Sequence, residues 1–195
     1  KYGAALEIWT TLQQHSNAST HPFLQCLALA TALELADPLL EFHQEDIFID
    51  PMQRYLHYEQ AWLFGELDPA FETLSVWELR CVINSAAPND QLAWGREMLC
   101  NYRPDHMLLE DKWRYCRIVR TDVFYRSLPS PPKDFKQILS GGGECGPRAQ
   151  MARFACKAFG IPTWGVRQPK HAAIARWTEK GWVICLGYEM KDSYW

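Results

Sequence analysis

The sequence has no apolar run close to the roughly 20 residues that a membrane-spanning helix needs, so we expect no membrane span. It has no excess of basic residues. Its formal net charge of -3 argues against a dedicated nucleic-acid binder, and no nucleic-acid partner is expected. It has no internal repeat and no low-complexity tract. Hydrophobic residues make up 48% of the chain, which excludes disorder, and 195 residues suit one domain with an extension.

The sequence also lacks the patterns that hold metals and disulfides. Its seven cysteines are scattered without a CxxC pair, which argues against a zinc ribbon or a thioredoxin motif. Because seven is odd, at least one thiol is unpaired in a monomer, and the spacing assigns no disulfide. His43 lies in an acidic connector without a second histidine nearby, so a solvated loop is favoured there over a metal site. No EF-hand pattern occurs, and neither metal nor cofactor is expected.

The ends of the chain and its charge distribution are also informative. The sequence begins at Lys1 without methionine or a signal peptide, so we expect a piece of a longer chain or a part of a larger complex. The sequon at Asn17 leaves a secreted or organellar location open.

Residues 135–195 hold nine Lys/Arg and four Asp/Glu, a net of +5, whereas residues 1–134 hold eleven and nineteen, a net of -8. Attraction between the two parts is favoured over an anionic ligand of the basic part.

The first two thirds of the chain have the apolar spacing of helices. Caps and breakers divide this part into segments, among them a capping box formed by Ser75 and Glu78. A proline-rich linker at residues 128–132 ends it. Helices are predicted twice within residues 1–36, and at residues 52–66, 75–84, 92–102 and 105–119.

The character of the sequence changes after the linker. Asp134 caps a short predicted helix that ends at residue 139, and a longer helix is predicted over residues 145–159. Gly160 and Pro162 stop that helix. Strands are predicted at residues 163–167, 171–177 and 182–186, the last two joined by a hairpin turn. The sequence therefore predicts an α+β fold, with a helical N-terminal part packed on a small core in which a central helix lies against an antiparallel sheet.

Cys145 has the surroundings of a reactive thiol. It follows a glycine-rich turn and stands in the first turn of a predicted helix, where free N–H groups and the helix dipole stabilise a thiolate. Gly143 and Gly146 leave room for a substrate carbonyl, and the backbone N–H of Cys145 is a candidate oxyanion donor. His171 opens a predicted strand and is the candidate base that takes the thiol proton.

This order of glycine turn, Cys145 helix, Gly-Ile-Pro stop, His171 strand and Gly-Trp strand resembles the transglutaminase-like branch of the papain-like fold, of the microbial or algal type with a helical N-terminal extension. The resemblance implies an extension over residues 1–130 and a catalytic core over residues 131–195, truncated at its C-terminal end. It also implies that Cys145 is the nucleophile and His171 the general base. The orienting Asp of the family falls at Leu186 or Gly187, so Glu189 and Asp192 are the candidate replacements.

The resemblance implies a cysteine acyl transferase or amide hydrolase that forms a thioester with a protein or peptide substrate bearing an amide side chain. Arg148, Trp164 and Trp177 are candidate substrate-binding residues. For Arg148 a salt bridge to the acidic part is the alternative, and for the tryptophans a place in the core. Two other functions stay open: a catalytically silent module that serves as a structural or interaction subunit, and a carbohydrate- or peptide-binding domain that uses the tryptophan faces.

Overall fold

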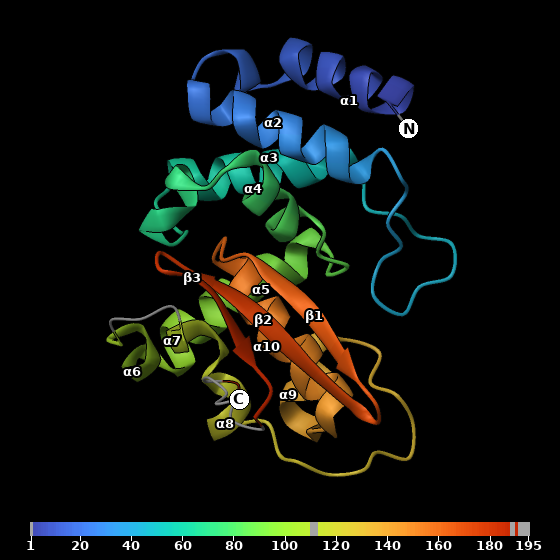
Figure 1. The fold of residues 1–195 in the computed structure, drawn as a ribbon, viewed down its shortest axis with the longest axis vertical. Coiled ribbons are helices and arrows are strands. Elements are labelled where there is room, and N and C mark those ends of the chain that lie inside the picture. The colour runs from blue at the N-terminus through green and yellow to red at the C-terminus, as the bar shows by residue number, and fades with distance from the viewer. Residues whose placement is uncertain (1, 110–112, 188–189, 191–195) are drawn as a thin grey trace. The chain divides into compact units, whose positions relative to one another are not determined.

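The structure is a computed structural model that describes residues 2–109, 113–187 and 190 (Figure 1). It has an α+β fold with a mostly helical N-terminal part, and a three-stranded antiparallel sheet that packs against a helix near the C-terminus, as the sequence predicts. The chain forms two compact units, Lys1–Asn89 and Asp90–Trp195. The domain boundary between residues 130 and 131 stays a prediction. None of the described helices is long and apolar enough to cross a membrane.

The first unit consists of helices. Asp50 caps α3 (Pro51–Leu63) and Ser75 caps α4 (Val76–Ile83) through their side chains, and Ser75 forms the predicted capping box with Glu78. The acidic connector around His43 is an exposed loop between helices. The helical elements are α1 (Tyr2–His15), η1 (Asn17–Ser19), α2 (Pro22–Leu35), α3 (Pro51–Leu63), η2 (Pro69–Thr73) and α4 (Val76–Ile83).

A buried arginine organises the end of the first unit. The guanidinium of Arg54 donates hydrogen bonds to the carbonyl oxygens of Ile83, Ser85 and Ala87, and to Oδ1 of Asn89. Burial lowers the pKa of Arg54 because the charged form loses water, and these four acceptors offset that loss. The buried guanidinium thereby fixes the loop that follows α4.

After the 14-residue helix α5 (Asn89–Tyr102), the second unit continues with short helices. The single helix predicted over residues 105–119 is wrong, because the structure has three short helices between residues 104 and 121. Their side chains at Trp113, Tyr115, Cys116, Ile118 and Val119 are all buried, which one apolar stripe of a continuous helix could not achieve. The helices of this unit are α5 (Asn89–Tyr102), α6 (Pro104–Met107), α7 (Trp113–Cys116), α8 (Ile118–Thr121), α9 (Phe135–Gly141) and α10 (Cys145–Ala158).

The core of the second unit is built around α10. Phe154 on α10 stacks on Phe135 of α9 with ring centres 4.1 Å apart, and it also faces Trp94 of α5. Gly95 of α5 lies so close to the Phe154 ring that a Cβ atom there would come within 2.7 Å of it. One side of α10 therefore packs on α5 and α9, which leaves its other side for the sheet.

The sheet has the order β1-β2-β3 with every neighbouring pair antiparallel. Its strands are β1 (Thr163–Gln168), β2 (His171–Thr178) and β3 (Gly181–Cys185). They begin within one residue of the predicted positions. The turns between them place Lys170 and Gly181 at positive φ, and both hairpins let consecutive strands pair directly.

The turn between α9 and α10 requires glycine at one position. Gly142 has φ +75° and ψ -156°, a conformation that only glycine adopts readily, and a Cβ atom there would lie 2.3 Å from the carbonyl oxygen of Phe124. The turn fixes where α10 begins. Its neighbour Gly141 lies in α9, where an added Cβ would find its nearest atom 3.9 Å away.

We therefore expect Gly142→Ala to lower the free energy of unfolding by roughly 3 kcal/mol, because it adds both backbone strain and a clash with a carbonyl. Gly141→Ala is the matched control. Since alanine favours the helix, it should leave stability unchanged or raise it by up to about 1 kcal/mol. Urea unfolding followed by circular dichroism measures both variants. Equal stabilities of the two would contradict the role assigned to Gly142.

Candidate functional site

Cys145 is the first residue of α10, as the sequence predicts. Glu144 occupies the N-cap position, but its side chain makes no capping hydrogen bond. Among the residues that the structure describes, the backbone N–H groups of Cys145 and Gly146 have no acceptor. These two donors and the positive end of the helix dipole therefore face a position where an anion would be stabilised.

The thiol of Cys145 lies on the helix side that faces the sheet. Cys145 and Phe154 are nine residues apart, which places their side chains about 180° apart around the helix. Phe154 packs towards α5 and α9, so Cys145 shares the opposite side with Ala149, Ala152 and Cys156, and α10 packs on β1 and β2. Cys145 is a free, half-buried cysteine.

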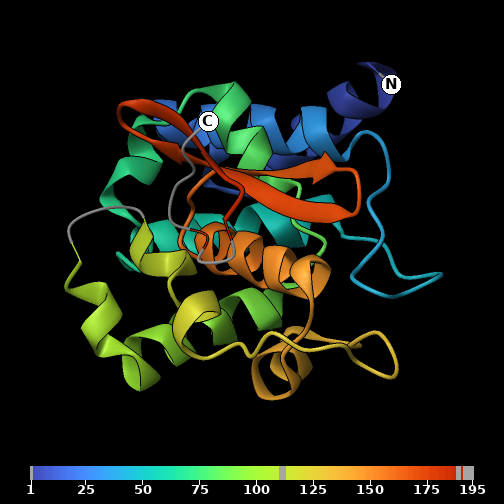
Figure 2. The same cartoon turned by 60° about the horizontal axis from the view of Figure 1, so that its bottom comes forward.

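Helix α10 and the sheet form two packed layers. The path of the chain places the first turn of α10 and the start of β2 at the same end of these layers. The 14 residues of α10 span about 21 Å, and the six residues of β1 return about 20 Å in the opposite direction. Gln168 at the end of β1 pairs directly with His171. Figures 1 and 2 both show the β1–β2 hairpin at the end of the layer where α10 begins. Cys145 and His171 therefore lie at one end of the α10–sheet layer, but no hydrogen bond joins these two described residues. The strand register puts His171 on the sheet face of Trp164 and Trp177, whereas Gly165 on the other face lies against Arg153 of α10.

The imidazole of His171 is held by a backbone carbonyl. Its Nε2 atom lies 2.8 Å from the carbonyl oxygen of Leu186, just past the end of β3. A carbonyl can only accept a hydrogen bond, so Nε2 carries the proton. In the neutral ring Nδ1 then has the lone pair, which makes Nδ1 the atom that can act as a base.

This contact was not predicted from the sequence. The family resemblance places an orienting acidic side chain at position 186 or 187, where Leu186 and Gly187 stand. A backbone carbonyl leaves no signal in residue types, so only the path of β3 reveals it. The two proposed replacements, Glu189 and Asp192, lie outside the described residues.

The two glycines near Cys145 differ in their surroundings. Gly143 is buried; its N–H donates to the Phe124 carbonyl at 2.9 Å and its own carbonyl accepts from Arg126. These two hydrogen bonds of Gly143 connect the turn between α9 and α10 to the segment after α8. At Gly146 no heavy atom lies within 4 Å of the place where a Cβ would stand, so this glycine leaves open space beside the thiol.

The candidate substrate-binding residues lie in different environments. Arg148 is 1% exposed; its guanidinium donates to the Val123 carbonyl and lies 6.0 Å from the centre of the Tyr125 ring. Trp164 on β1 is 50% exposed, whereas Trp177 on β2 is 8% exposed. The strand register puts both tryptophans on one face of the sheet. Arg148 is thus turned into the interior, while Trp164 is open to a ligand.

Comparison of the chain with models of protein families, with curated proteins and with solved structures finds no match. The transglutaminase-like resemblance therefore stays a prediction. Among the residues that the structure describes, no group of three or more His, Cys, Asp and Glu side chains could hold a metal ion.

The contact with Leu186 makes a prediction about the His171 ring. We expect the neutral form of the His171 ring to be a single tautomer with a slowly exchanging proton on Nε2, because the Leu186 carbonyl accepts it. Long-range ¹H–¹⁵N spectra of protein with ¹⁵N-labelled histidine report the tautomer, and loss of the signal in His171→Gln assigns it among the six histidines. A proton on Nδ1, or rapid exchange between tautomers, would contradict this arrangement.

Proposed function

We propose that the chain is a transglutaminase-like acyl transferase or amide hydrolase that works through a thioester on Cys145. The observation that carries this proposal is the hydrogen bond from His171 to the Leu186 carbonyl, which leaves Nδ1 as the basic atom at the end of the layer where the Cys145 helix begins.

In the proposed reaction the proton of the Cys145 thiol passes to Nδ1 of His171. The thiolate attacks the carbonyl carbon of an amide or ester, and a sulfur–carbon bond forms. The negative oxygen of the tetrahedral intermediate accepts hydrogen bonds from the backbone N–H groups of Cys145 and Gly146, which have no acceptor among the described residues. When the carbon–nitrogen or carbon–oxygen bond breaks, the leaving group takes the proton from His171 and a thioester remains.

The thioester is then resolved by a second nucleophile. Nδ1 of His171 takes a proton from water or from an amine, and the resulting nucleophile displaces the Cys145 sulfur. Water gives hydrolysis, or deamidation of a side-chain amide, whereas an amine gives transfer and crosslinking. The proposed substrate is a protein or peptide with an amide side chain. Exposed Trp164 is the candidate to contact it, and the open space at Gly146 admits its carbonyl.

The alternative function is a catalytically silent module that serves as an interaction or structural subunit. One observation favours it: leucine stands where the orienting acid of the family would stand, so the imidazolium formed during the reaction has a neutral partner. A carbonyl dipole stabilises an imidazolium less than a carboxylate does. The alternative therefore predicts an ordinary thiol at Cys145.

Alkylation with iodoacetamide separates the two. Cys26 and Cys100 are exposed, whereas Cys145 is half-buried, so access alone would make Cys145 the slower thiol. If His171 acts as the base, Cys145 is alkylated at least about tenfold faster than both exposed cysteines at neutral pH. His171→Gln should remove this advantage while leaving Cys26 and Cys100 unchanged. Peptide mass spectrometry after timed quenching measures all three rates in one sample.

Alkylation of Cys145 at or below the rates of Cys26 and Cys100 supports the silent module instead. An advantage that persists in His171→Gln would mean that the helix start alone activates the thiol, and it would contradict the proposed base.

A further inference from the structure

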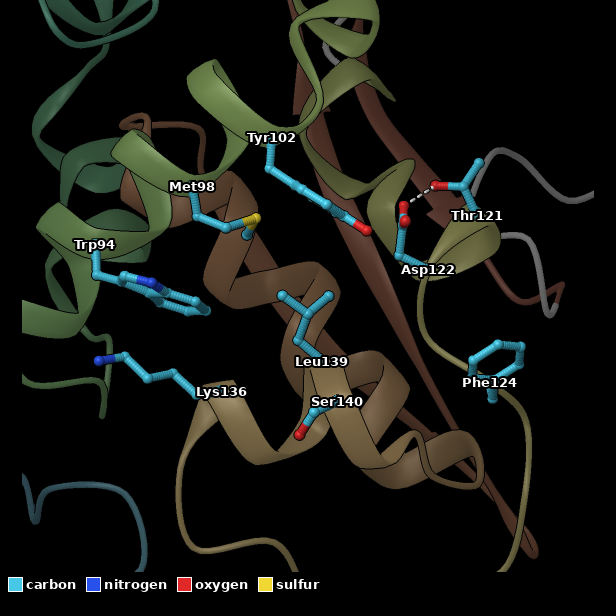
Figure 3. Close-up of a pocket in the computed structure, with 9 residues that line it drawn as sticks. All are labelled: Trp94, Met98, Tyr102, Thr121, Asp122, Phe124, Lys136, Leu139 and Ser140. Atoms are coloured by element: carbon cyan, nitrogen blue, oxygen red, sulfur yellow. Dashed lines mark hydrogen bonds between the residues drawn. The ribbon is translucent and has the colours of Figure 1, made fainter.

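A pocket of about 650 Å³ lies on the second unit, between α5, α9 and the segment that follows α8 (Figure 3). Its volume is typical of sites for small molecules. Trp94, Met98 and Tyr102 stand four residues apart on α5 and so present one continuous face to it. Leu139 and Phe124 complete an apolar and largely aromatic lining. Such a lining favours a flat apolar ligand.

The two charged side chains that line the pocket differ in whether a partner of opposite charge balances them. Asp122 and Lys136 are its two charged lining residues. The Asp122 carboxylate accepts hydrogen bonds from Nη1 of Arg103 and from Oγ1 of Thr121, each at 2.5 Å, so its charge is compensated. Lys136 has no carboxylate partner among the residues that the structure describes; its Nζ atom lies 5.4 Å from the centre of the Trp94 ring. The pocket therefore presents one uncompensated positive charge.

A hydroxyl group accompanies this charge. Ser140 stands four residues after Lys136 on α9, so both side chains lie on the same helix face and line the pocket. Within the described part of the chain the Ser140 hydroxyl has no hydrogen-bond partner. Figure 3 shows the Lys136 ammonium turned towards Trp94 and the Ser140 hydroxyl pointing away from it, so the ammonium beside the aromatic wall is the donor that suits a carboxylate.

From this geometry we infer that the pocket binds a small molecule with a flat aromatic body and a carboxylate group. The body lies against Trp94, Met98 and Leu139, and the carboxylate pairs with the ammonium of Lys136 at the Trp94 side of the pocket. A cationic ligand is disfavoured, because the Asp122 carboxylate is already bound by Arg103. None of the lining residues takes part in the proposed reaction of Cys145 and His171. Ligand binding in this pocket can therefore be tested independently of that reaction.

The test uses two probes of the same shape, 2-naphthoate and its neutral counterpart 2-naphthalenemethanol. Their binding is followed on the methyl resonance of Met98 in protein with ¹³C-methyl methionine, where five methyl signals occur and Met98→Leu assigns the relevant one. A naphthalene ring in the pocket shifts the Met98 signal and leaves that of buried Met151 unchanged. We expect the carboxylate to bind about tenfold more tightly than the alcohol, as one charge-assisted hydrogen bond would give.

Lys136→Met keeps the length and apolar stem of the side chain but removes its charge. It should reduce the preference for the carboxylate to less than about twofold and leave binding of the alcohol unchanged. Lys136→Glu should abolish carboxylate binding. Leu139→Trp, which fills the pocket, should abolish binding of both probes. A Met98 signal that neither probe shifts, or equal affinities of the two probes for the unmodified chain, overturns the proposal.

Discussion

The arrangement of the second unit depends on the packing of α10 between two layers. Phe154 packs on one side towards α5 and α9, and the opposite side of α10 carries the small residues Ala149 and Ala152, which allow the sheet to approach closely. Because α10 and β1 have almost equal lengths, the chain returns to the level at which the helix began before β2 starts. Both members of the proposed Cys–His pair owe their location to this one constraint.

Much of this fold could be predicted from the sequence. The Ser75–Glu78 capping box, the aspartate cap at Asp134 and the glycine stop at Gly160 are local signals, and the structure has a helix boundary at each of them. The strands alternate with clear turn residues, so their positions were also predictable. Local signals suffice where a boundary depends on hydrogen bonds between residues a few positions apart.

Contacts between distant segments could not be predicted. The carbonyl of Leu186 binds His171 across 15 residues of sequence, through an atom that every residue type has. The sequence predicts a substrate contact or a salt bridge to the acidic part for Arg148, but its guanidinium donates to a buried carbonyl 25 residues away. The segment 105–119 has helical spacing, yet burial on several sides breaks it into short helices. Nor did the periodicity reveal the pocket, because its walls come from three separate segments.

The central claim is that Cys145 forms an acyl-enzyme with the help of His171. The most direct measurement is incubation with p-nitrophenyl acetate, acid quenching, and location of the acetyl group by peptide mass spectrometry. The account predicts rapid acetylation of Cys145 as a thioester that neutral hydroxylamine removes, and its loss in His171→Gln. Acetyl groups on lysines alone, or on Cys26 and Cys100 as fast as on Cys145, would contradict it.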